Sequence, residues 1–199
     1  MVLEKLSIET IELTEAQKVT QTEAYFFKED ENGRLGHPSL NVPMPTPHEK
    51  LSLPFEIGWL HFRYFTDYSG TNPELGFATA YSAPNVEATI YVYNNGLEQV
   101  PSDLNAEIVG AEFFKVNSGI LAQNAGLEAW PDVINDGTHI FKMYKADPEG
   151  LRVTGVSLTT SNDHFVKVRI SWLRDYDIDR ISIGFVESVA AMFRASMAH

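Results

Sequence analysis

The chain has 199 residues, of which 44% are hydrophobic and 21% are charged, a composition typical of a single folded domain spanning residues 1–199. Its 27 acidic and 15 basic side chains give a net charge of −12, which disfavours binding of nucleic acid or anionic lipid over a broad face. The absence of cysteine excludes disulfides, thiolate catalysis and cysteine-ligated metal centres.

Targeting signals are not evident in the sequence. No stretch approaches 18 apolar residues, so we expect no insertion into a membrane. The start, MVLEKLSIETIEL, lacks the cationic residues and the apolar core of a signal peptide. The compartment is therefore left open, and an exported mature form is compatible with the sequence.

The first 28 residues predict a strand, a helical turn and a second strand. The strands follow from the β-branched residues of LEKLSIETIEL and KVTQTEAYFF, and the turn follows from a capping box at Thr14–Gln17. The glycines and prolines of about residues 29–54 predict a long loop. Too little chain precedes this loop to form a core, so we assign it to the same domain.

Strands are predicted next at 59–68, 77–81 and 88–93, with turn residues between them. The period then changes, which predicts a helix starting at Ser102 as N-cap. Its buried face should carry the apolar residues at spacings of three and four, namely Leu104, Ile108, Ala111 and either Phe114 or Lys115.

The second half predicts an antiparallel meander followed by a helix. THIFKMYKA, LRVTGVSLTT and HFVKVRISWL read as strands, because the turn residues DPEG and SND separate them. In residues 176–197, Ile178, Ile181, Phe185 and Val189 recur at helical spacing. This order of elements predicts the α+β class, an antiparallel sheet flanked by at least two helices.

The same region resembles one fold family. A hairpin-rich sheet that ends in HFVKVRISW and continues into a helix containing GFVESV is similar to the closing strand and helix of the PsbP-like fold. Photosystem II extrinsic proteins and a Ran-binding import factor share that fold, and LGFATAYSAPNVEATIYVYNNG is similar to strand pairs of its uncharacterised bacterial members. The resemblance covers about residues 55–197. It implies an α/β sandwich and a non-enzymatic binding or accessory role, and it assigns no functional residue.

Catalytic and metal-binding patterns are weak. The sequence has no GxSxG, P-loop or GxGxxG motif, and none of its six histidines forms an HxxxH or HxH pair. His37 and His48 with the acids near Glu29 could hold a metal, but solvated loop histidines are the better interpretation. The acids of DYDID (175–179) likewise suit a helix start better than a Ca²⁺ site, because the glycine and closing glutamate of an EF-hand are missing. We therefore predict no catalytic residue, no metal site and no cofactor.

One face of the predicted sheet carries cations and tyrosines. Residues 138–175 hold six cations and four acids, a net charge of +2, against −14 for the remainder. Because strand side chains alternate between faces, one face should carry the candidate ligand-binding residues Lys142, Lys167, Arg169, Tyr91 and Tyr93.

Such a face suits a small anionic ligand or an acidic protein partner, since Arg binds carboxylate or phosphate bidentately. The alternative is a solvated face with cross-strand ion pairs. For the whole protein, the alternative to a binding protein is a small-molecule enzyme with its site between the Pro-rich loop and the sheet.

Overall fold

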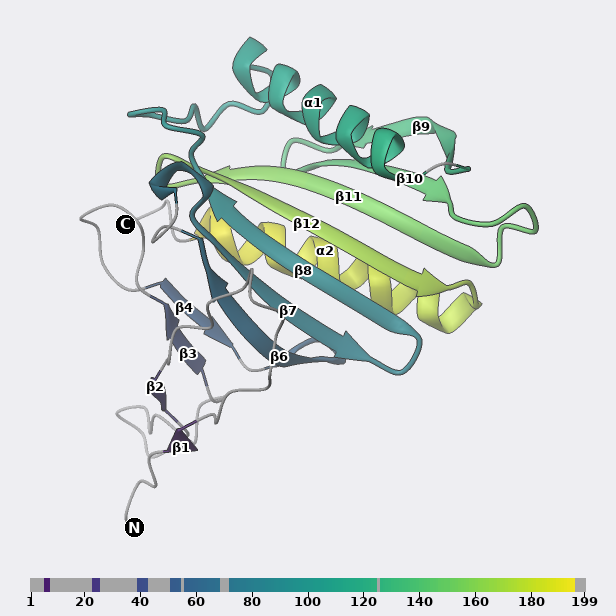
Figure 1. The fold of residues 1–199 in the computed structure, drawn as a ribbon, viewed down its shortest axis with the longest axis horizontal. Helices are drawn as coiled ribbons and strands as arrows, with labels where there is room; N and C mark the ends of the chain where they lie inside the picture. Colours follow the sequence, from purple (N-terminus) through teal and green to yellow (C-terminus); the bar gives the residue numbers. More distant parts are fainter. Residues whose placement is uncertain are drawn as a thin grey trace.

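The computed structural model describes residues 6–7, 23–25, 39–42, 51–54, 56–68, 72–124 and 126–195 (Figure 1). Its centre is an eight-stranded antiparallel sheet in the order β5-β6-β7-β8-β12-β11-β10-β9. The strands are β5 (Glu56–Ile57), β6 (Leu60–Asp67), β7 (Phe77–Ala83), β8 (Val86–Tyr93), β9 (Glu128–Asn135), β10 (Ile140–Lys145), β11 (Arg152–Ser161) and β12 (His164–Leu173). With helices α1 (Glu107–Gln123) and α2 (Tyr176–Ala195) on opposite faces of this sheet, the predicted α+β class is confirmed.

Tight hairpins set the register of the central strands. Asn85 connects β7 to β8 with a φ of 64°, and Asn162 and Asp163 connect β11 to β12 with φ of 45° and 64°. Asn and Asp tolerate this left-handed conformation, which two-residue hairpin turns require. The β7–β8 turn is shorter than SAPNVE predicts, because both strands extend into that segment. The predicted meander is confirmed as β10, β11 and β12.

α2 covers one face of the sheet and builds the larger core. Phe185, Val186, Val189 and Phe193 are buried against apolar side chains of β8 and β12, among them Ile90 and Val168. The helix begins at Tyr176, where Asp177 and Asp179 lie in its first turn. Acids there favour the positive end of the helix dipole. The predicted helix and its buried stripe are therefore confirmed, and its last predicted residues, 196–197, lie outside the described residues.

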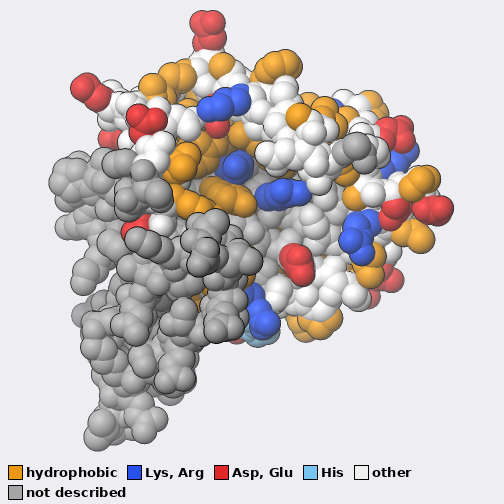
Figure 2. Space-filling model, in the orientation of Figure 1, with side chains coloured by type: hydrophobic (Ala, Val, Ile, Leu, Met, Phe, Trp, Pro, Cys, Tyr) orange, Lys and Arg blue, Asp and Glu red, His pale blue; other side chains and the backbone are white. Residues whose placement is uncertain are grey.

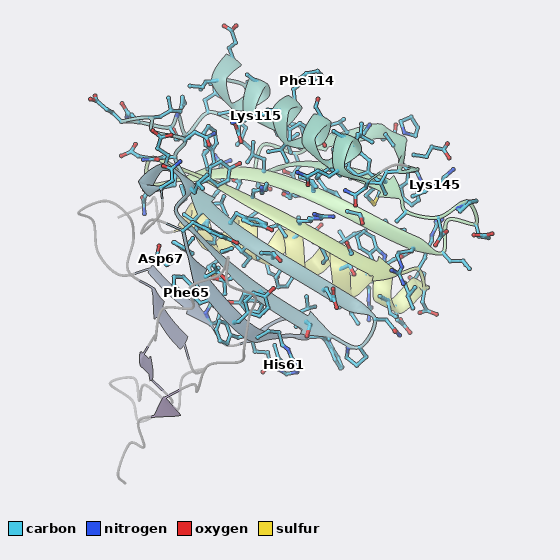
Figure 3. The ribbon with its side chains drawn as sticks, in the orientation of Figure 1. His61, Phe65, Asp67, Phe114, Lys115 and Lys145 are labelled. Carbon is cyan, nitrogen blue, oxygen red and sulfur yellow. The ribbon has the colours of Figure 1, made fainter. Side chains whose placement is uncertain are left out.

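α1 lies over the opposite face, and its predicted boundary and face were wrong. The helix begins at Glu107 rather than after Ser102, because Asp103 accepts a hydrogen bond from the Asn105 amide at 2.9 Å and forms a separate turn. Its buried residues are Val109, Glu112, Phe113 and Ile120. Ile108 and Phe114 are exposed, and Figure 3 shows Phe114 on the outer side of α1. The sequence carries two apolar stripes, and the one that packs on Tyr93 and Phe165 is the buried one.

Two further features differ from the sequence prediction. The edge strand β9 was missed, since it contains Pro131 and is almost entirely exposed. A second sheet joins β1 (Leu6–Ser7), β2 (Glu23–Tyr25), β3 (Ser39–Val42) and β4 (Leu51–Pro54). β3 and β4 lie within the predicted 29–54 loop and are strands. The rest of that loop and the predicted turn at 14–17 lie outside the described residues.

Candidate functional site

A hollow of about 410 Å³ lies between α1 and the sheet. Its floor comes from β8 and β12, its roof from α1, and one wall from the segment around the short helix η1 (Pro73–Leu75). Figure 2 shows Lys and Arg side chains in a recess on this side of the molecule, next to hydrophobic ones. The polar lining residues are Tyr68, Tyr91, Tyr93, Asn95, Glu112, Lys115, Gln123, Lys167 and Arg169, and the apolar ones are Leu75, Val116 and Ile120.

Four of the five predicted site residues meet on this floor. β12 pairs with β8 so that Lys167 lies opposite Tyr91, and Phe165 lies opposite Tyr93. The ammonium group of Lys167 lies 4.1 Å from the ring centroid of Tyr91 and 5.5 Å from that of Tyr93. Cations are attracted to the faces of aromatic rings at such distances. The two-residue alternation of both strands thus brings the cations and the tyrosines together.

Lys142, the fifth predicted residue, lies on the same sheet face but outside the hollow. It is opposite Val156 on β11, and Val156 is opposite Arg169 on β12. Two strand spacings, about 10 Å, therefore separate Lys142 from Arg169. The Lys142 ammonium group donates a hydrogen bond to the Pro131 carbonyl oxygen of β9 at 3.2 Å. Lys142 therefore lies outside the hollow, next to the edge strand β9.

The roof holds a buried acid that sequence reasoning missed. Glu112 accepts a hydrogen bond from the Tyr93 hydroxyl at 2.8 Å and another from the Asn95 side-chain amide at 2.8 Å. The Lys115 ammonium group is 3.6 Å from one Glu112 oxygen. The sequence feature that could have revealed it is its position on the same helical stripe as Val109 and Phe113, because a carboxylate on a buried stripe needs a polar partner.

Burial and neighbouring charges change the proton affinities in the hollow. The pKa of Lys167 is lowered from its ordinary value, mainly by loss of hydration, with Arg169 and Lys115 acting in the same direction and Glu112 opposing them. Burial raises the pKa of Tyr91, and burial together with Glu112 raises that of Tyr93. Among the described residues, neither the Lys167 ammonium nor the Arg169 guanidinium has a hydrogen bond or an ion pair.

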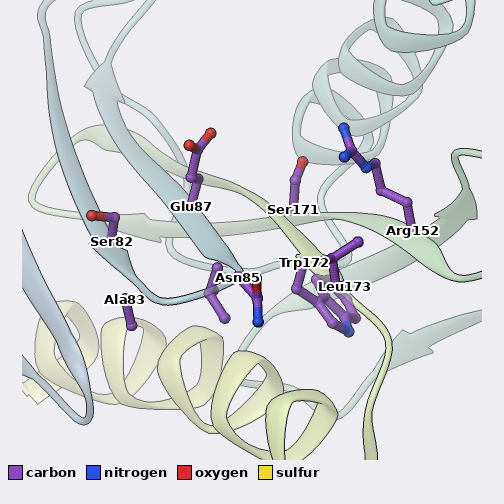
Figure 4. Close-up of a pocket in the computed structure, with 9 residues that line it drawn as sticks. Ser82, Ala83, Asn85, Glu87, Arg152, Ser171, Trp172 and Leu173 are labelled. Carbon is purple, nitrogen blue, oxygen red and sulfur yellow. The ribbon is translucent and has the colours of Figure 1, made fainter.

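A second hollow, of about 360 Å³, lies at the other end of β8 and β12 (Figure 4). Glu87, Ser171 and Arg152 point to one side of the sheet, whereas Asn85 and Trp172 lie on the other side. The Trp172 ring nitrogen donates to Asp179 at 2.6 Å. The polar groups of this second hollow do not converge on one point, so it is the weaker candidate site.

Histidines and acids are dispersed over the described part of the chain. Within those residues, no group of three or more His, Asp or Glu side chains could hold a metal ion. His139 contacts Asp136, and His164 contacts the Asn162 carbonyl oxygen. Asp175 accepts a hydrogen bond from the Asp177 amide at 3.0 Å, as expected of acids at a helix start. His37, His48 and His199 lie outside the described residues, as does most of the Pro-rich loop of the enzyme alternative.

Comparisons with known proteins give a limited result. No family model matches the chain, and no curated protein matches it. Two solved structures are similar, the Saccharomyces cerevisiae Ran-binding protein Mog1p and a point mutant of protein Mog1. Their sequence identities are 17% and 16%, the matches cover 75% of this chain and 86% and 87% of theirs, and both TM-scores are 0.33. Likeness at this level gives this chain no partner and no activity.

None of the described helices is long and apolar enough to cross a membrane.

Proposed function

We propose that this protein is a non-enzymatic binding protein that holds a small anionic ligand in the hollow between α1 and strands β8 and β12. The observation that supports the proposal best is the pair Lys167 and Arg169. Both line the hollow, and both lack a hydrogen bond or ion pair from the described residues. Glu112, the acid that lines the hollow, already accepts hydrogen bonds from Tyr93 and Asn95.

The energetics favour an anion. Burial of a cation without a hydrogen bond or ion pair is unfavourable, which agrees with the lowered pKa of Lys167. A ligand carboxylate or phosphate would replace the lost hydration with charge-assisted hydrogen bonds, and the Arg169 guanidinium can offer two parallel donors.

The form of the site favours a small ligand over the acidic protein partner that the sequence also left open. The volume of about 410 Å³ falls within the range of small-molecule sites, about 300–1,000 Å³. The net charge of −12 opposes extended polyanions, whereas a small ligand meets mainly the local cations.

Calorimetric titration of the full chain with acetate, phosphate and sulfate tests the proposal. We expect Arg169→Ala to weaken anion binding about tenfold or more, because a hydrogen bond to a charged group contributes about 1.5–3 kcal/mol. Added salt should weaken binding further. Lys142→Ala is the matched control, since it removes a cation from the same sheet face outside the hollow.

The double variant Lys167→Ala, Arg169→Ala should lose binding. Unchanged affinity in the double variant would remove this hollow from consideration, and a parent protein that binds none of a broad set of anions would refute the proposal.

A further inference from the structure

We infer that the ligand is a monoanionic carboxylate carried on an apolar body, such as a medium-chain fatty acid or an arylalkanoic acid. This inference rests on the proposed function and concerns the chemistry of its ligand. It follows from the number of charged donors left in the hollow, from the composition of its walls, and from the charge of the whole chain.

The charged donors that remain in the hollow match one carboxylate. The Tyr93 hydroxyl and the Asn95 amide are both engaged by Glu112, and Lys115 lies close to that same carboxylate. The charged donors left in the hollow are Lys167 and Arg169, two residues apart on one strand, and Tyr68, Tyr91 and Gln123 add only neutral donors. A carboxylate has two oxygens, so one guanidinium and one ammonium satisfy it.

Backbone donors for a phosphate are missing from the floor. Phosphate sites in proteins usually add backbone N–H groups from a helix N-terminus or a glycine-rich loop. β8 is hydrogen-bonded to β7 and β12, and β12 is hydrogen-bonded to β8 and β11. Both floor strands are therefore central in the sheet, and their N–H groups are committed to its ladders. The additional oxygens of a phosphate would find few partners there.

The remaining walls suit an apolar body. Val116 and Ile120 line the hollow from α1, and Leu75 lines it from η1. Ile120 also packs with Val156, which lies beside Arg169 on the neighbouring strand. Apolar surface thus adjoins the cations, and the ring faces of Tyr91 and Tyr93 already lie against the Lys167 ammonium. A ligand that ended at its carboxylate would leave this surface in contact with water.

The charge of the molecule also selects against multiply charged ligands. Repulsion from the acidic remainder of the chain grows in proportion to the charge on the ligand, so a dianion meets twice the opposition of a monoanion. Attraction to the Lys167–Arg169 pair grows in the same proportion, but the cost of removing the ligand's charge from water grows faster, as the square of that charge. A monoanion therefore gains more from the site relative to what it loses on entering the partly buried hollow.

A chain-length series tests the inference on the full chain. Titrations with acetate, butanoate, hexanoate and octanoate, all below micelle formation, should show affinity rising by about fourfold for each methylene that becomes buried. Octanoate should bind more tightly than octyl phosphate and much more tightly than octan-1-ol. Leu75→Ala, at a position that is 49% exposed, should weaken octanoate binding severalfold more than acetate binding. Arg169→Ala should weaken the binding of every acid in the series.

The outcomes separate this inference from the proposed function. Acetate and octanoate binding equally, with both lost in Arg169→Ala, would overturn the inference and leave the anion site in place. Tighter binding of octyl phosphate than of octanoate would overturn the preference for a carboxylate. Octan-1-ol binding as tightly as octanoate, or octanoate binding unchanged in Arg169→Ala, would overturn both the inference and the proposed anion site.

Discussion

Lys167 stands on a central strand, where most side chains on the opposite face belong to the core. Its side chain is partly buried on the floor of the hollow, and its ammonium group lies over Tyr91. The charged or titratable groups that line the hollow around it are Glu112 and Lys115 from α1, Tyr91 and Tyr93 from β8, Tyr68 just after β6, and Arg169 from its own strand. Loss of hydration outweighs the single nearby acid, so the protonated amine is less favourable than in water.

The pH dependence of anion binding should report this environment. Raising the pH deprotonates Lys167, and because its pKa is lowered, the loss of affinity should begin below the ordinary lysine value of 10.5. The raised pKa values of Tyr91 and Tyr93 keep both tyrosines neutral over that range. Titrations between about pH 7 and pH 10 measure the effect, given the ordinary lysine pKa. Lys167→Arg should flatten the profile, because a guanidinium stays charged.

The lowered pKa of Lys167 also affects the folding stability of the protein, but in the opposite direction to its effect on anion affinity. In the window between the lowered pKa of folded Lys167 and 10.5, the unfolded chain binds more protons, so this residue makes the free energy of unfolding rise with pH.

For the anion titrations, an affinity that stays level up to pH 10 in the parent protein would contradict the assignment of Lys167 to the site.

Phe185 is the clearest test of the α2 core. It is 1% exposed, and its ring centroid lies 5.6 Å from that of Tyr81. Phe185→Ala should lower the free energy of unfolding by about 3–5 kcal/mol, as emptying a buried aromatic site does. Phe114→Ala on α1 is the matched control, since Phe114 is 73% exposed and its loss should change stability by no more than about 0.5 kcal/mol. Denaturant melts compare the two, and equal effects would contradict the assigned core.

At the scale of elements, α1 is joined to the sheet by a polar link within an apolar contact. Val109 and Phe113 pack on Tyr93 and Phe165, and Glu112 between them is hydrogen-bonded to β8 and to the turn that follows it. A buried carboxylate with both oxygens engaged fixes the helix against the strand more specifically than apolar contact alone. The roof of the hollow therefore depends on Glu112 for its position.

Glu112→Gln should separate the structural role of this acid from its charge. The amide can accept the Tyr93 hydrogen bond, but its NH₂ group would then face the NH₂ group of Asn95, so stability should fall by about 1–3 kcal/mol. Anion affinity should rise, because a negative charge leaves the hollow. Melts and acetate titrations on the same variant measure both effects. Weaker anion binding in this variant would show that the position of the roof matters more than its charge.

Prediction from sequence succeeded where one pattern dominated a segment. In α2 the apolar residues form one stripe, and in β12 the alternation of Val166, Lys167, Val168 and Arg169 leaves one choice of faces. Four of the five candidate residues meet for that reason. The prediction of the buried face of α1 failed because Ile108 and Phe114 form a competing apolar stripe, whereas Val109 and Phe113 are the residues that pack on the sheet.

Other elements depend on contacts that the local sequence does not carry. β9 is almost entirely exposed, contains Pro131, and pairs along the free edge of β10. Glu112 is part of the site because the rotation of α1 about its axis places its carboxylate next to the Tyr93 hydroxyl. Lys142 lies outside the site because strand β11 separates it from Arg169. Its ammonium group is hydrogen-bonded instead to the Pro131 carbonyl oxygen of β9. Sheet order and helix register are long-range results, which strand periodicity alone does not supply.

At the scale of the whole molecule, charge is divided between a broad acidic surface and a small basic region. Residues 138–175 carry a net charge of +2 and the remainder −14. Of the cations in this basic region, Lys167 and Arg169 line the hollow. At physiological ionic strength the Debye length is about 8 Å, so distant acids are largely screened while groups in contact with a ligand are not. The acidic surface therefore disfavours polyanions and leaves room for a local anion site.

The last prediction concerns how the whole chain is stabilised. The sequence has no cysteine, and among the described residues no set of His, Asp and Glu side chains could hold a metal ion. We expect folding to need no transition metal, so Tm should change by no more than about 2 °C after chelation, an effect of less than 1 kcal/mol for a domain of this size. Structural zinc sites in small domains contribute about 10–16 kcal/mol, so loss of such a site would be unmistakable. Elemental analysis of untagged protein and melts before and after chelator provide the measurement. One equivalent of zinc together with a large fall in Tm would contradict the prediction, and the variant His37→Ala, His48→Ala would then show whether the Pro-rich segment supplies the ligands.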